Sequence, residues 1–186
     1  MKRFLKQIHF LPQFSSIGFF ILALPVVIAI AGGLWLTAAA AYENVKFVHT
    51  TDQLLSLIGI ARSDAATDAE FGQRTNEDII DDMVRRAQFR PQPTNSWGGG
   101  LRATIQPLPY MRIETDVPVR ACRRLAQFFG KDASAFRLLK LEAYAEGGNW
   151  QTIFDATTMR NFDYRLINTA CGRGTTATFA ITLQFR

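Results

Sequence analysis

Two cysteines carry the clearest chemistry in this sequence of 186 residues. Cys122 and Cys171 are its only cysteines, and in an oxidising compartment such a pair usually forms a disulfide. Closing a loop of about 50 residues would stabilise the fold by about 4 kcal/mol in the chain-entropy account. The alternative is two buried free thiols. We predict the disulfide, on the condition that this part of the chain is exported.

Residues of metal-binding type do not lie at the spacing that metals need. His9 and His49 are the two histidines, and no cysteine or histidine spacing fits a zinc site. Asp78, Asp81 and Asp82 lack the glycine and the spaced ligands of a calcium loop, so we interpret them as the early turns of a solvated, capped helix. The sequence therefore predicts no metal and no other cofactor.

The sequence also contains no recognisable catalytic motif. Residues 98–100 form a glycine triplet, but a phosphate-binding loop would add Lys-Ser/Thr and open onto a helix. We expect a tight turn ahead of a strand instead. A hydrolase needs a nucleophile, a base and an orienting group, and His49 stands alone on a predicted helix. No Gly-x-Ser-x-Gly occurs, and we predict that the chain is not an enzyme.

The net charge of +5 is unevenly distributed along the chain. Lys2, Arg3 and Lys6 precede a long apolar segment, and residues 43–186 carry 18 basic against 16 acidic residues, a net charge of +2. That balance requires no nucleic-acid partner. We interpret the arginines around the first cysteine as a solvated helix face: Arg120, Arg123 and Arg124. Cations ahead of an apolar segment mark the cytoplasmic side of a membrane, which places the rest of the chain outside the cytoplasm.

Residues 17–41 contain no charge and exceed the about 20 apolar residues that span a bilayer as a helix. Removal as a signal peptide, with a cut after residues 38–41, is the alternative, but the apolar core is longer than such peptides have. The helix continues without proline into residues 43–66, where one face recurs at three- and four-residue steps. That face consists of Phe47, Thr51, Leu54, Ile58, Ala61 and Ala65. The pattern predicts one long helix, first membrane-spanning and then amphipathic.

The remaining chain alternates strand and helix patterns. A second helix is expected from Thr75 to Ala87, and a helix from Pro118 stops at Gly130. The expected strands are residues 101–108, 110–117, 136–144, 150–156 and 176–185, with a hairpin turn at 146–149 and a helical or irregular segment at 162–170. We predict an α+β fold in which the membrane-spanning helix packs on an antiparallel β-sheet head domain.

Four motifs in this order resemble a type IV pilin, nearer to the type IVb group. They are GFFILA at 18–23, TTDQLLSLIGIARS at 50–63, NSWGGGLRATI at 95–105, and DVPVRACRRLAQFF at 116–129 with the later NTACG at 168–172. The resemblance implies a leader of residues 1–18 cleaved between Gly18 and Phe19. It also implies a spine helix over 19–66 and a head over 67–186, with a disulfide-bounded region at 122–171.

In this resemblance the N-terminal helix is the assembly element. Its contacts would come from Phe19, Phe20, Leu22, Ala23, Pro25, Ile28, Gly32, Gly33 and Leu36. Small residues allow helices to approach closely. Ala23 stands where pilins usually carry a glutamate thought to pair with a neighbour's N-terminal amine, and its absence resembles certain minor or tip pilins.

The resulting hypothesis is a structural subunit of a type IVb pilus or of a related secretion or conjugation filament. Its expected partners are other copies or other pilins, the inner membrane, the prepilin peptidase and the pilus assembly machinery. It would reside in a bacterial inner membrane with its head in the periplasm, and then in an extracellular pilus. The alternative is a non-polymerising single-pass inner-membrane protein whose periplasmic domain serves an envelope machine.

Overall fold

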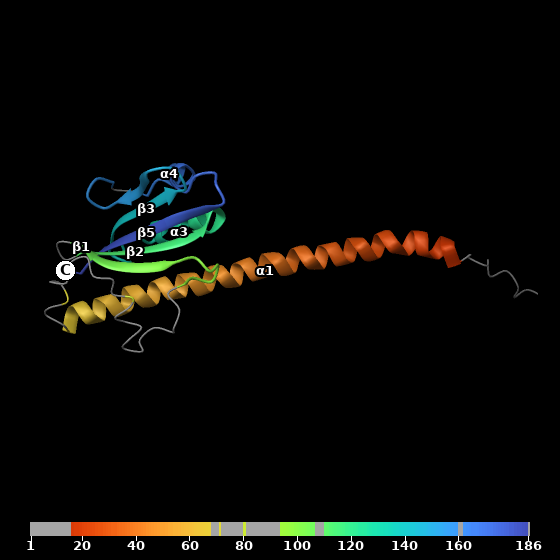
Figure 1. Cartoon of the computed structure of the whole chain (residues 1–186), viewed down its shortest axis with the longest axis horizontal. Coiled ribbons are helices and arrows are strands. Elements are labelled where there is room, and N and C mark those ends of the chain that lie inside the picture. Colours follow the sequence, from red (N-terminus) through yellow and green to blue (C-terminus); the bar gives the residue numbers. More distant parts are fainter. Residues whose placement is uncertain are drawn as a thin grey trace, which may run out of the picture. The chain divides into compact units, whose positions relative to one another are not determined.

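The structure is a computed structural model (Figure 1). It describes residues 16–67, 71, 80, 94–106, 110–159 and 162–185, with the side chains of residues 16–24, 26–27 and 30–31 left out. The chain divides into two compact units, Met1–Asn44 and Val45–Arg186. Most of the expected leader and of the expected helix at 75–87 lies outside the described residues. Within that second helix, Ile80 is described and is buried.

The first helix, α1, runs over Ser16–Thr67 and contains Pro25. The predicted continuity between the apolar and the amphipathic stretch is confirmed. The predicted membrane span is wrong: within the described part of the chain, no helix has both the length and the apolar character that a bilayer crossing requires.

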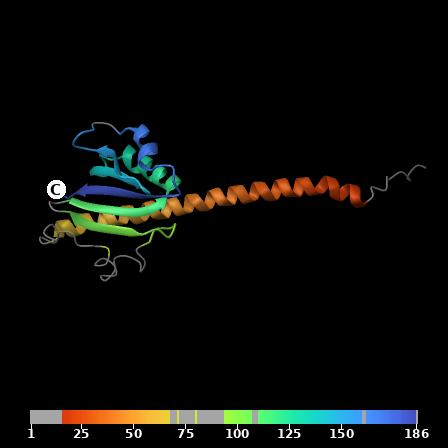
Figure 2. The ribbon, with the colours of Figure 1, turned by 45° about the horizontal axis from the view of Figure 1, so that its top comes forward.

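One antiparallel sheet forms the second unit, in the order β1-β2-β5-β3-β4. The strands are β1 (Leu101–Gln106), β2 (Tyr110–Pro118), β3 (Leu138–Ala145), β4 (Trp150–Asp155) and β5 (Thr176–Gln184). The period-two strand expected at the C-terminus is confirmed, and it occupies the centre of the sheet (Figure 2). The predicted α+β class with an antiparallel sheet therefore holds for the head, although the membrane-spanning part of that prediction does not.

A single apolar core lies on one face of the sheet. Alternate strand residues point into it, among them Ala103, Ile113, Leu141, Phe179 and Ile181, each with 0 % exposure. The C-terminal part of α1 and α3 (Val119–Lys131) contribute to the same core, and so do Ile167 and Ala170 of α4. The predicted helix face is confirmed: Thr51, Leu54, Ile58 and Ala61 are buried, and Phe47 and Ala65 are half-buried.

Single residues account for where the two shorter helices begin, and Gly130 has a different role from the predicted one. Helix α3 starts directly after Pro118, as predicted, but continues past Gly130 to Lys131. Gly130 does not end the helix; a Cβ there would lie 2.1 Å from the Phe162 ring, so glycine makes room for that ring. The segment expected to be helical or irregular contains α4 (Tyr164–Ala170), which Asp163 caps by accepting a hydrogen bond from the Arg165 amide at 2.8 Å.

Candidate functional site

The N-terminal part of α1 exposes its apolar side chains. We call residues 28–42 the apolar segment; every side chain described there is exposed. Its large residues include Ile28 (61 % exposed), Leu34 (66 %), Trp35 (77 %) and Leu36 (71 %). Isolated exposed apolar residues are common, but a contiguous exposed apolar surface marks an interaction site.

The predicted processing and assembly residues divide into two groups. Gly18, Phe19, Phe20, Leu22 and Ala23 lie in the first turns of α1, and their side chains are outside the described residues. Pro25, Ile28, Gly32, Gly33 and Leu36 are all exposed. A Cβ added at either Gly32 or Gly33 would meet nothing within 4 Å, so the described part of the chain leaves these backbone positions open.

The predicted disulfide between Cys122 and Cys171 is present, with its Cα atoms 5.9 Å apart. Both cysteines are fully buried, and the bond joins α3 to the end of α4. Arg123 adds a second link, because its Nη2 donates a hydrogen bond to the carbonyl of Gly172 at 2.9 Å. The two ends of the region 122–171 are therefore joined by the disulfide and by this hydrogen bond.

Aromatic contacts hold α1 to the head within the second unit. Phe47 lies edge-on to Phe128 at 6.4 Å, and the Arg124 guanidinium lies 4.1 Å above the Phe47 ring. A cation over an aromatic face adds roughly 0.5–1 kcal/mol at exposed sites. Farther along α1, Arg62 donates a hydrogen bond to the Phe136 carbonyl. The arginines of α3 are thus partly structural, beyond the solvated role predicted for Arg124.

The glycine triplet is explained by a turn that Asn95 holds together. The Asn95 Oδ1 accepts hydrogen bonds from the amides of Trp97 at 2.8 Å and Gly99 at 3.1 Å, and its Nδ2 donates to Thr115 Oγ1 at 2.8 Å. Gly98 has a φ of +81°, and a Cβ on Gly99 would lie 1.8 Å from the Asp116 carbonyl oxygen. The predicted tight turn ahead of a strand is confirmed, and the glycines serve close backbone approach.

The same turn attaches to α1. The Ser96 amide donates to Thr50 Oγ1 at 3.3 Å, and Gln53 Nε2 donates to the Thr94 carbonyl at 3.4 Å. Thr50 is fully buried and Asn95 is 4 % exposed. Sequence reasoning missed both residues, because only their buried contacts distinguish them from ordinary loop and helix residues.

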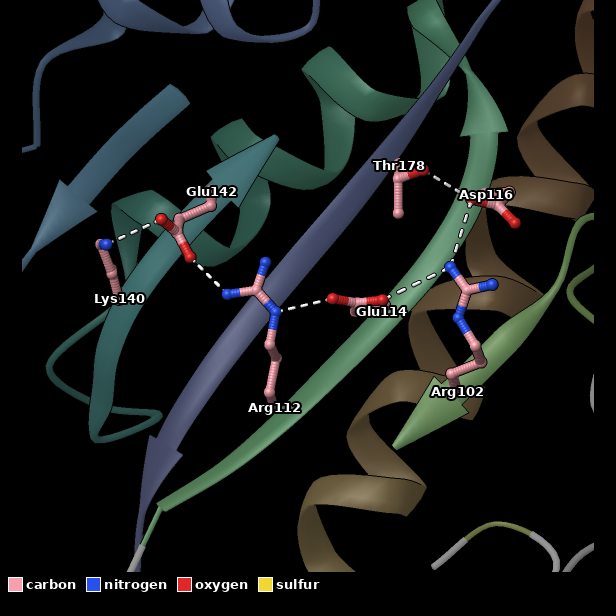
Figure 3. A network of polar contacts seen from close by, with 7 residues as sticks. All are labelled: Arg102, Arg112, Glu114, Asp116, Lys140, Glu142 and Thr178. Atoms are coloured by element: carbon pink, nitrogen blue, oxygen red, sulfur yellow. Dashed lines mark hydrogen bonds and ion pairs between the residues drawn. The ribbon is translucent and has the colours of Figure 1, made fainter. Parts of the chain in front are cut away.

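The face of the sheet opposite the core carries a network of charges (Figure 3). Arg112 of β2 donates to Glu114 on its own strand at 2.7 Å and reaches across β5 to Glu142 of β3. Glu142 also pairs with Lys140 at 2.7 Å. Ala180 of β5 is the register partner of both glutamates, so a small residue lies beneath the path of the Arg112 side chain.

Ion pairing changes the acidity of this network. Burial alone would raise the pKa of Glu142, but the hydrogen bonds from Lys140 and Arg112 outweigh it and hold that pKa below its ordinary value. For Arg112, burial alone would lower the pKa, and the bonds to Glu114 and Glu142 raise it above its ordinary value. Both groups therefore stay charged, and the network is electrically balanced at neutral pH.

An open hollow of about 230 Å³ lies at one end of this face. It is lined by Asp116, Tyr144, Glu146, Thr176, Ala177 and Thr178. Tyr144 packs against the exposed Trp150 of β4, with ring centroids 5.6 Å apart. No local sequence pattern indicates the hollow, because its lining comes from three strands and a turn, and local patterns do not encode the order of strands in the sheet.

Comparisons with known proteins do not assign this arrangement. No family model, curated protein or solved structure matches the chain. Among the described residues, no group of three or more histidine, cysteine or acidic side chains could hold a metal ion.

Proposed function

We propose that this chain is a structural subunit of a filament of the type IVb pilus kind, or of a related secretion or conjugation filament. Copies assemble through the N-terminal part of α1, and the disulfide-closed head is carried on the outside. The subunit is of the minor class, because Ala23 replaces the acid that repetitive assembly in pilins uses.

The exposure of the apolar segment is the observation that carries this proposal. Trp35 and Leu36 are more than 70 % exposed, while Leu54 and Leu57 of the same helix are at most 1 % exposed. Burying an exposed leucine-sized side chain yields about 1.5–3 kcal/mol. Several such residues on each copy supply a strong driving force for helices to pack together, and Gly32 and Gly33 allow their backbones to approach.

The head supports a location outside the cytoplasm. A buried disulfide persists in the periplasm and at cell surfaces, where the environment is oxidising. Under this proposal the chain is first located at the inner membrane. There the peptidase cleaves it and the assembly machinery adds it to the growing pilus. These partners follow from the resemblance of residues 18–23 to a pilin cleavage site.

A substitution in the apolar segment tests assembly. Trp35→Glu should remove the chain from filaments sheared off the cell surface, since each copy would bury an unpaired charge between helices. Tyr164→Glu is the matched control, because Tyr164 is an exposed aromatic residue (54 %) on α4 of the head. Recovery of both variants in sheared filaments at the level of the unmodified chain would contradict the proposal.

N-terminal sequencing tests processing separately. The mature chain should begin at Phe19, as the cleavage motif implies. An intact Met1 on chains recovered from filaments would contradict the processing step while leaving assembly through α1 in place. Solitary chains in cells that lack filaments of this protein would favour the non-polymerising alternative.

A further inference from the structure

Both acidic and apolar residues line the hollow on the outer face. Asp116 and Glu146 supply two carboxylates from different elements, the end of β2 and the turn after β3. The side chains of Tyr144, Thr176 and Thr178 supply apolar surface. A long cationic side chain matches this combination, because its stem packs on apolar atoms while its charge reaches the carboxylates.

Nearby cations leave these carboxylates accessible. Asp116 accepts a hydrogen bond from Thr178 Oγ1 at 2.6 Å, and Arg102 approaches its Oδ1 to only 3.9 Å with a side chain that is 52 % exposed. Within the described part of the chain, no hydrogen bond or ion pair engages the Glu146 carboxylate. The two remaining cations of this face, Arg112 and Lys140, are held by the network around Glu142 (Figure 3).

The size of the hollow limits its occupant. At about 230 Å³ it is smaller than the roughly 300–1,000 Å³ of typical small-molecule sites. A single side chain fits this space better than a whole metabolite. Two acidic residues lining one hollow favour arginine over lysine, because a planar guanidinium has separate N–H groups for two carboxylates.

An exposed aromatic residue beside the hollow indicates a protein as the source of that arginine. Trp150 is 40 % exposed and is held in place by Tyr144 on one side and by the Arg112 guanidinium, 4.2 Å from the ring centroid. Tryptophan, tyrosine and arginine are the residues most enriched at the energetic centres of protein interfaces. A rigid exposed ring next to an acidic hollow is therefore suited to a protein surface that presents an arginine.

We propose that the hollow and Trp150 form a docking surface for a partner protein, which inserts one arginine between Asp116 and Glu146. The arginine stem lies on Tyr144 and Thr176, and the surface around it contacts Trp150. This proposal does not depend on filament assembly, because all of its residues belong to the head.

Binding of short peptides to the full chain tests the docking surface. The probes are acetyl-Ala-Arg-Ala-amide, the same peptide with lysine, and the same peptide with citrulline, the neutral isostere of arginine. The signals of methyl-labelled Thr176 and Thr178 report binding by NMR. The arginine peptide should shift both signals, bind at least tenfold more tightly than the citrulline peptide and more tightly than the lysine peptide, and weaken as salt is added.

Two variants locate the effect. Glu146→Gln should weaken the arginine peptide at least tenfold, whereas Asp132→Asn, which neutralises an exposed acid at the end of α3, should leave its affinity unchanged. Equal binding of arginine and citrulline peptides, no shift with any peptide, or no effect of Glu146→Gln would each overturn the proposal. Lysine binding as tightly as arginine would overturn the choice of side chain. Spermidine binding more tightly than the peptides would overturn a protein side chain as the occupant.

Discussion

The two parts of α1 contain similar residues in opposite environments. Leu34 and Leu36 are 66 % and 71 % exposed, whereas Leu54 and Leu57 are 1 % and 0 % exposed. The second pair belongs to the apolar core of the second unit, whereas the first pair lies in the other unit and is exposed. An apolar pattern along a helix therefore does not by itself show whether the folded chain buries that face.

Removal of the disulfide in the head should cause the largest loss of stability. Replacing both cysteines, Cys122→Ser with Cys171→Ser, should lower the free energy of unfolding of the head by about 4 kcal/mol, because the bond closes a loop with a sequence separation of 49. Denaturant unfolding of the full chain measures this loss. Reduction of the unmodified chain should give the same loss, and an unchanged midpoint in both cases would show that the head does not depend on its disulfide.

A Leu→Ala substitution in each part of α1 compares the stability contributions of an exposed and a buried leucine. Leu57→Ala should lower the free energy of unfolding by about 3 kcal/mol, since it leaves a cavity in the core. Leu36→Ala should change it by less than about 0.5 kcal/mol, as for other exposed positions. Unfolding of the unassembled chain in urea measures both. Similar losses for the two variants would mean that residue 36 is covered by the chain itself.

Glycines provide a second matched pair. Gly99→Ala should cost about 2 kcal/mol, because its Cβ would clash with the Asp116 carbonyl and force the turn to shift. Gly59→Ala, on α1 with nothing within 4 Å of its Cβ, should raise the stability of the head by about 0.5–1 kcal/mol through helix propensity. Thermal unfolding of both variants tests the signs. A gain from Gly99→Ala would rule out the tight turn around Asn95.

The ion pairs on the outer face of the sheet should make a smaller, pH-dependent contribution to the free energy of unfolding. The folded pKa of Glu142 is lowered, so its stabilising contribution is present above the unfolded value of about 4.3 and is lost as the pH falls through the lower folded value. Glu142→Gln should therefore cost about 1 kcal/mol at pH 7 and flatten the loss of stability below about pH 4.3.

Unfolding curves between pH 7 and pH 2.5 measure that change. Glu146→Gln is the control, because Glu146 makes no ion pair in the described part of the chain, and this variant should keep the free energy of unfolding of the unmodified chain at pH 7. An unchanged slope in the Glu142→Gln chain would show that the ion pairs with Arg112 and Lys140 contribute nothing to the folded state.

The sequence predicted the elements whose signals are local. The three- and four-residue steps from Phe47 to Ala65, the proline at the start of α3 and the alternation in β5 each depend on nearby residues, and the structure contains all three. The disulfide was also predictable, because Cys122 and Cys171 allow one pairing. Gly130 was assigned the wrong role, since its contact with Phe162 comes from a distant segment.

Features that depend on strand order could not be predicted. The placement of β5 between β2 and β3 brings Arg112 and Glu142 together across Ala180, and no local pattern encodes that order. The hydrogen bonds of Asn95 to Thr115 and of Thr50 to the turn have the same origin. The membrane span was predicted from composition alone, and the described part of α1 does not support it.

Imaging of filaments containing this chain, at a resolution that traces helices, would test assembly through the N-terminal part of α1. We expect Leu34, Trp35 and Leu36 to be buried between helices of neighbouring subunits, with the disulfide-closed head on the outside. Filaments in which these side chains remain exposed, or in which subunits contact each other through their heads alone, would contradict it.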